Sequence, residues 1–144
     1  MIQWVDEETG EGRFESVYFC NDEGQGEMAV YADSSIPDFR ECAERCVEQF
    51  NRLPDTAVRE ICERLIGCAA ESGWEDLPSP DDPREILESC WFVALYADMA
   101  GQEDEVGYVV EGEGDWGEAV GFAVHDGRVT YVGPDYLDAM EHPY

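Results

Sequence analysis

The sequence predicts an α+β fold: one antiparallel sheet built from strands at both ends of the chain, with two to three central helices packed on one of its faces. Aromatic and β-branched stretches separated by turn residues fill residues 1–33 and the region from Cys90 onward, as strands do. Residues 37–89 show helical periodicity instead. A chain of 144 residues can bury one substantial core, so we expect a single domain over residues 1–144.

The N-terminal region predicts a meander of three short strands. They are Gln3–Val5, Arg13–Cys20 and Glu27–Ala32. The segments Thr9–Gly12 and Asn21–Gly26 between them are rich in glycine and small polar residues, which form turns.

Two helices are expected next. The first spans residues 37–51, with Ser35 as N-cap, and its apolar residues share one face: Phe39, Cys42, Ala43, Cys46, Val47 and Phe50. The second follows Pro54, with Asp55 as N-cap and Gly73 as its C-terminal stop. Its apolar stripe comprises Val58, Ile61, Cys62, Leu65, Ile66 and Ala69.

A third, short helix is expected after a loop over Trp74–Asp82. Asp82 is a candidate N-cap, Pro83 suits the first helical position, and Glu85 completes a capping box. This helix ends near Ser89.

The chain then returns to strand. Trp91–Ala97 is a nearly continuous apolar run, typical of a strand buried on both faces. Val106–Val110, Ala119–Val124 and Arg128–Val132 are further strands, and Asp126-Gly127 predicts a tight hairpin between the last two. Apolar residues alternate with small ones in Ala119–Val124, so one face of this strand is expected to be buried.

Net charge limits the function more than any motif does. The chain has 35 Asp and Glu residues against 8 arginines and no lysine, a formal net charge of −27. This balance disfavours nucleic acids and anionic membranes, which are bound through Lys and Arg, and it favours cationic partners. The N-terminus MIQWVDEE lacks the pattern of a signal peptide, so the expected location is cytoplasmic.

One acidic block is a candidate partner-binding surface. Eight acids and no base lie between Asp98 and Glu118, in the expected loops joining the last strands. A solvated rim and a docking surface both fit this pattern, and each loop tryptophan is either a cap on the core or an interface anchor. The candidate binding residues are Glu103, Asp104, Glu105, Glu111, Glu113, Asp115, Trp116 and Glu118, with Trp74 and Asp76 from the other acidic loop.

Catalytic and metal-binding patterns are weak. His125 and His142 have no neighbouring nucleophile at a recognisable spacing, and no phosphate-binding motif is present. Residues 111–118 alternate acids with glycines but do not match a calcium-binding EF-hand loop. The six cysteines are best interpreted as small buried hydrophobes, with disulfides or zinc as the alternatives. We expect no enzyme activity, catalytic residue, cofactor or metal.

The segment Gly114–Gly133 resembles the C-terminal hairpin of a bacterial family of uncharacterised domains, whose motif reads W-x-x-E-H-G followed by G-[KR]-V-x-x-V-G. The matching positions are Trp116, Gly121, Gly127, Arg128, Val129, Val132 and Gly133. Ala119-Val120 replaces the usual Glu-His pair, which weakens the case for an active site at this motif. Residues 82–87 also resemble the family's midsection. Some members look like immunity proteins of toxin systems, which implies a binding function.

Charge and resemblance together predict an immunity-type inhibitor that neutralises a basic protein toxin by electrostatic complementarity. The alternatives are a DNA mimic that occupies the groove of a nucleic-acid-binding protein, and an enzyme of unrecognised class with a halophile-like acidic bias. The expected partner is a basic protein, with no direct binding to nucleic acid or membrane. The sequence does not predict the oligomeric state.

Overall fold

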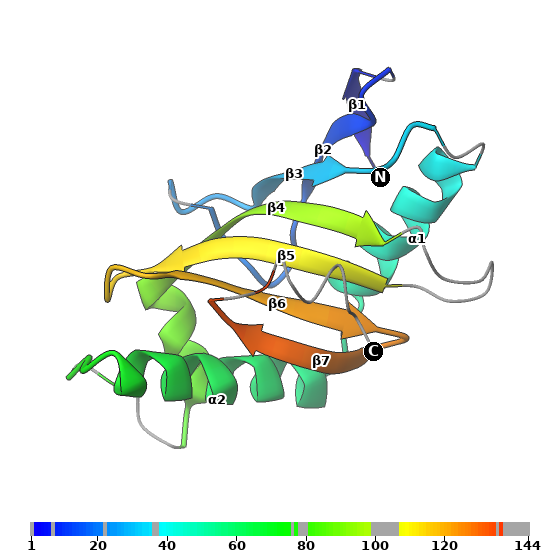
Figure 1. Cartoon of the computed structure of the whole chain (residues 1–144). Coiled ribbons are helices and arrows are strands. Elements are labelled where there is room, and N and C mark those ends of the chain that lie inside the picture. Colours follow the sequence, from blue (N-terminus) through cyan, green and yellow to red (C-terminus); the bar gives the residue numbers. More distant parts are fainter. Residues whose placement is uncertain are drawn as a thin grey trace.

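The computed structural model describes residues 2–6, 8–21, 23–35, 38–75, 77, 81–98, 107–134 and 136. Within these residues the chain has the predicted α+β fold (Figure 1). Its strands are β1 (Gln3–Asp6), β2 (Glu11–Glu15), β3 (Glu27–Tyr31), β4 (Cys90–Asp98), β5 (Gly107–Gly114), β6 (Ala119–His125) and β7 (Arg128–Gly133). Between β3 and β4 lie the helices α1 (Phe39–Asn51) and α2 (Asp55–Glu71) and the short 3₁₀ helix η1 (Pro83–Ser89).

The seven strands lie in sequence order in one mixed sheet. Every neighbouring pair is antiparallel except β3 and β4, which are parallel. The reason is the connection: α1, α2 and η1 form a crossover that returns the chain to start β4 in the direction of β3. The parallel pair lies at the centre of the sheet and sets Tyr31 beside Tyr96.

The three helices pack on one face of the sheet, as predicted. α1 contacts β4, and α2 contacts both β7 and η1. In Figure 1 the strand β5 passes in front of the lower part of α1. Val120, Phe122 and Val124 of β6 face these helices and are at most 2% exposed, which confirms the expected buried face. The core also takes in the apolar stripes of the two long helices, including Ile61 and Leu65.

The strand expected over Arg13–Cys20 is wrong in its second half. β2 ends at Glu15, and the chain then turns because the Phe19 amide donates to Ser16 Oγ at 3.1 Å. Asn51 of α1 fixes this loop: its Oδ1 accepts from the Val17 amide at 2.9 Å, and its Nδ2 donates to the Glu15 carbonyl at 2.8 Å. The loop directs Phe19, which is 1% exposed, into the core.

The residues that begin and end the helices match the predicted caps only in part. Gly73 has φ +84° and ends α2 in a Schellman arrangement, in which the Trp74 amide donates to the Ala69 carbonyl at 2.9 Å. Asp82 is the N-cap residue of η1 and Pro83 follows it, as expected, although no side-chain capping bond forms there. The caps expected for the two long helices are wrong: Ser35 Oγ donates to Asp33 instead of capping α1, and Asp55 is the first residue of α2 rather than its cap.

The C-terminal strands are longer than expected. β5 continues to Gly114, so part of the acidic block is strand rather than loop. β4 buries Cys90, Phe92 and Leu95 on the helix side and is half-buried at Trp91 and Tyr96 on the other, so burial on both faces is only partial. The hairpin turn is confirmed, because Asp126 and Gly127 have φ values of 50° and 77°.

The six cysteines are all free thiols. Cys46, Cys62 and Cys90 are buried in the core, as expected of small hydrophobes, whereas Cys20 is exposed and departs from that expectation. Burial raises the pKa of the Cys62 thiol to about 11 and that of Cys90 to about 12. At neutral pH these two thiols are therefore protonated and shielded from reagents.

We expect thiol alkylation to separate these cysteines. In the native protein at pH 8, Cys20 should react fast and Cys62 and Cys90 slowly, because a thiol reacts as the thiolate. In denaturant all six should react. Mass spectrometry of peptides after timed alkylation measures each rate. Rapid native labelling of Cys62 or Cys90 would contradict the burial of these thiols.

Candidate functional site

One face of the sheet lies opposite α1, α2 and η1. We call it the open face and define it over β2–β6 by the side chains that alternate with the core residues. They are Glu11, Arg13, Glu15, Glu27, Ala29, Tyr31, Trp91, Ala94, Tyr96, Val109, Glu111, Glu113, Gly121 and Ala123. The candidate site lies at the centre of this face.

A pair of stacked tyrosines forms that centre. Tyr31 of β3 and Tyr96 of β4 are register partners across the parallel strand pair, so their side chains rise side by side. Their ring centroids are 5.3 Å apart and the planes differ by 20°. Both residues are half-buried, which leaves part of the pair accessible to a partner.

Glutamates flank the tyrosine pair. Tyr96 Oη donates to Glu111 Oε1 at 2.6 Å, and Glu11 is the register partner of Tyr31 on β2. Burial and the hydrogen bond to Glu111 raise the pKa of Tyr96 well above its ordinary value. Burial and then Glu11 also raise the pKa of Tyr31. Both hydroxyls are therefore protonated at neutral pH.

A third tyrosine covers the neighbouring part of the face. Tyr136, 7% exposed, packs with Val109 and Ala123, and a Cβ at Gly121 would lie 2.5 Å from its Cγ. Burial, then Glu111 and Glu113, raise the pKa of Tyr136. Glycine at position 121 therefore lets an aromatic ring lie flat against the strand beside the glutamates.

Acidic side chains lie on both sides of the sheet. The described side chains of the open face over β2–β5 include five glutamates and one arginine. α1 carries three glutamates and two arginines, and α2 carries four acids and two arginines. Pairs such as Arg52–Glu48 at 2.9 Å and Arg59–Glu63 at 3.0 Å partly neutralise the helices. The described side chains of the open face over β2–β5 therefore sum to a charge of −4, and those of α1, α2 and η1 sum to −1, −2 and −1.

This charge predicts a salt-dependent stability. The melting temperature should rise with NaCl between 0.01 and 0.15 M, because the screening length falls from ~30 Å to ~8 Å and weakens repulsion among the acids. Thermal unfolding followed by circular dichroism measures the change. A flat response would show that the acids are too dispersed to repel one another.

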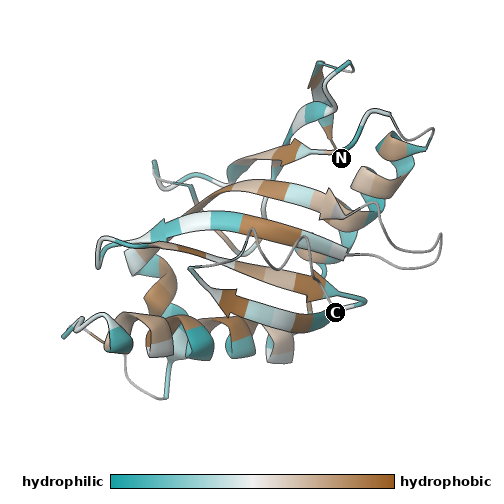
Figure 2. Ribbon diagram, in the orientation of Figure 1, coloured by the Kyte–Doolittle hydropathy of each residue, from teal (hydrophilic) through white to brown (hydrophobic). Residues whose placement is uncertain are grey.

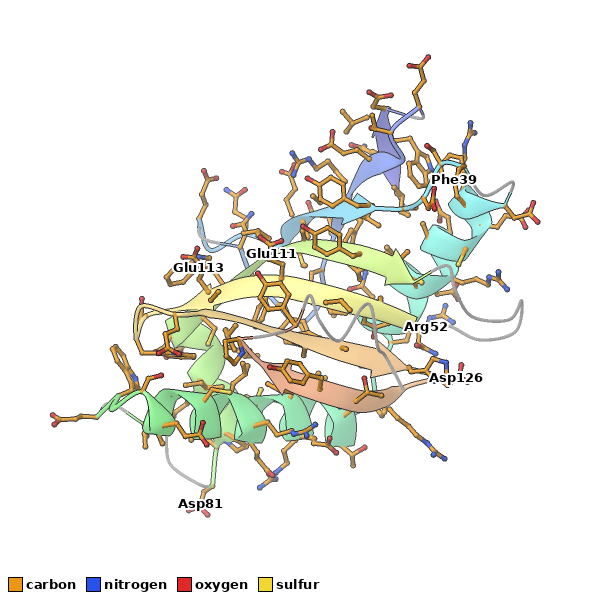
Figure 3. All side chains as sticks on the ribbon, in the orientation of Figure 1. Phe39, Arg52, Asp81, Glu111, Glu113 and Asp126 are labelled. Carbon is orange, nitrogen blue, oxygen red and sulfur yellow. The ribbon has the colours of Figure 1, made fainter. Side chains whose placement is uncertain are left out.

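The predicted binding residues are divided between the two sides of the sheet. Glu111 and Glu113 project from β5 on the open face (Figure 3), at the hydrophilic end of that strand (Figure 2). Asp115 and Glu118 lie exposed in the β5–β6 turn. Glu103, Asp104, Glu105 and Asp76 lie outside the described residues. The docking role of all these acids stays a prediction.

The two loop tryptophans contact each other on the helix side. Their ring centroids are 6.4 Å apart with planes at 60°, and both pack against the core. The Schellman turn after α2 places Trp74, and Trp116 lies over Gly114, where a Cβ would be 2.5 Å from its ring. This geometry fits the core-cap interpretation of Trp116 and separates the ring from the open face.

Replacing Trp116 by alanine should therefore act on stability. We expect the melting temperature to fall by roughly 4–8 °C, since a half-buried indole contributes about 2 kcal/mol of packing. Differential scanning calorimetry measures the shift. An unchanged melting temperature together with weaker partner binding would instead identify Trp116 as an interface anchor.

The described residues contain no group of three or more His, Cys, Asp or Glu side chains placed to hold a metal ion. Sequence reasoning missed the tyrosines. Tyr31 and Tyr96 each follow the alternation of their strand, but only the parallel pairing of β3 and β4 brings them together.

A family model described as "Domain of unknown function (DUF6985)" matches residues 3–139. The chain belongs to this family. The match confirms the expected kinship with a family of uncharacterised domains and covers every helix and strand of the DUF6985 domain. Searches of curated proteins and of solved structures found no match. Among its described helices, none is long and apolar enough to cross a membrane.

Proposed function

We propose that this DUF6985 domain is a non-enzymatic, immunity-type binding protein of the cytoplasm, which neutralises a basic protein toxin by docking it on the open face. One observation carries the proposal. Five glutamates and one arginine lie among the described side chains of the sheet face opposite α1, α2 and η1, and two of these glutamates, Glu11 and Glu111, flank a stacked tyrosine pair.

The two kinds of side chain on this face would have different roles. The glutamates would attract a basic partner over long range and raise its association rate. The tyrosines would supply contact area at low entropic cost, as tyrosine does at the centre of many protein interfaces. Glu111 would serve both roles, because it is charged and is held by Tyr96.

Mimicry of DNA is less well supported. A row of acids along β2 would resemble a phosphate backbone, but Arg13 interrupts it between Glu11 and Glu15. On the helix side the acids alternate with arginines and form ion pairs along the same helix.

The proposal is tested by capturing the partner and then co-expressing it. The wild-type domain should retain a basic protein from a native lysate, and its co-expression should relieve the growth defect caused by that protein. Glu111→Lys/Glu113→Lys should fail in both assays. Glu85→Lys/Glu88→Lys, which changes two exposed acids of η1, should behave as wild type. Equal capture by both variants, or capture without relief of growth, would refute the proposal.

A further inference from the structure

We propose that Tyr31 and Tyr96, flanked by Glu11 and Glu111, form a subsite for an arginine side chain of the basic partner. The inference rests on the proposed function, because it assumes that a protein docks on the open face. It adds the chemistry of the group that is recognised there.

The tyrosine pair remains partly accessible on the open face. The rings stand on neighbouring strands with centroids 5.3 Å apart and nearly parallel planes, so a flat cationic group can extend the stack. Guanidinium groups stack on aromatic rings in this manner, attracted by the negative ring face. The half-buried state of both residues limits their motion and leaves them accessible.

Carboxylates lie on both flanks of that surface. Glu111 uses Oε1 to accept the Tyr96 hydroxyl at 2.6 Å, and a carboxylate has lone pairs for further donors. Glu11 lies opposite Tyr31 on β2. Arg13, two residues along the same strand, is the one basic side chain among the five glutamates of this face, so most of the negative charge remains for a partner to neutralise.

The geometry favours arginine over lysine. The guanidinium is planar, offers five N–H donors and is weakly hydrated, so it can stack on a ring and bond carboxylates at the same time. The lysine ammonium is a compact, strongly hydrated charge that gains less from the tyrosines. The preference for arginine over lysine therefore depends on the tyrosine rings, whereas the attraction of either basic side chain depends on the glutamates.

Two capped peptides test this difference at low ionic strength: one alternates arginine with glycine, and the other alternates lysine with glycine. Isothermal titration calorimetry should show about fivefold tighter binding of the arginine peptide to the wild-type domain. Tyr31→Leu/Tyr96→Leu should abolish this preference while leaving the lysine affinity nearly unchanged. If the double variant fails to fold, Tyr31→Leu alone should reduce the preference.

A second pair of variants tests the glutamates. Glu11→Gln/Glu111→Gln should weaken the binding of both peptides. Glu85→Gln/Glu88→Gln on η1 removes the same two charges away from the subsite, so it should lower the two affinities less. Equal affinities of the two peptides for the wild-type domain would overturn the arginine subsite and leave the proposed docking face intact. Equal effects of the two glutamine variants, or no binding of either peptide, would overturn both the arginine subsite and the proposed docking face.

Discussion

Replacing Phe19 by alanine is expected to lower the free energy of unfolding by about 3–5 kcal/mol, the usual cost of removing a buried aromatic ring. The Phe19 ring stacks on Phe50 with centroids 5.2 Å apart and meets Phe92 and Phe122 at 5.2 and 5.3 Å. It therefore joins α1 to β4 and β6. The corresponding fall in melting temperature is roughly 6–20 °C for a chain of this size.

The control for this variant lies in the same loop. Val17 is 67% exposed, so Val17→Ala should change the free energy of unfolding by less than about 0.5 kcal/mol. Chemical denaturation of both variants and of the wild-type protein gives the two differences directly. Losses of similar size would mean that Phe19 does not join the core as the structure shows.

Phe19 also shows where local sequence patterns stop being informative. The run from Val17 to Phe19 has the β-branched and aromatic residues of a strand, and the sequence predicts one. The loop forms instead because Asn51, which is more than thirty residues away, bonds the backbone on either side of Ser16. Such a long-range contact has no local signature, whereas the β6–β7 hairpin does, through Asp126-Gly127.

The same limit applies to the candidate site. Glu111 and Glu113 share a face because they are two residues apart in one strand. Their proximity follows from the sequence only if the strand predicted to end at Val110 continues to Gly114, as β5 does. The stacking of Tyr31 on Tyr96 depends on the pairing of β3 with β4 across the helical crossover. No alternation within either strand specifies that register. Contact between Trp74 and Trp116 likewise depends on where α2 ends relative to β5.

Reversing the charge of Glu111 and Glu113 should have the largest effect on function. The double lysine variant changes the net charge by four, from −27 to −23, and does so on the open face. Electrostatic steering raises association rates by 10- to 1,000-fold, so we expect association with the basic partner to slow by roughly tenfold or more. Its dependence on salt should become weaker, because fewer favourable long-range contacts remain to be screened.

Stopped-flow association kinetics at several salt concentrations measure this effect, and two variants isolate its cause. Glu85→Lys/Glu88→Lys makes the same change in net charge on η1, so a dependence on total charge alone would slow both proteins equally. Glu113→Lys alone leaves the 2.6 Å hydrogen bond between Tyr96 and Glu111 in place, so any slowing that it causes cannot come from lost positioning of Glu111. If association slows in the open-face variants and the η1 variant associates nearly as fast as the wild type, the charges that attract the partner lie on the open face. Equal slowing in the open-face and η1 variants would show that the attraction comes from the net charge of the whole molecule. It would then remove the reason for placing the partner on this face.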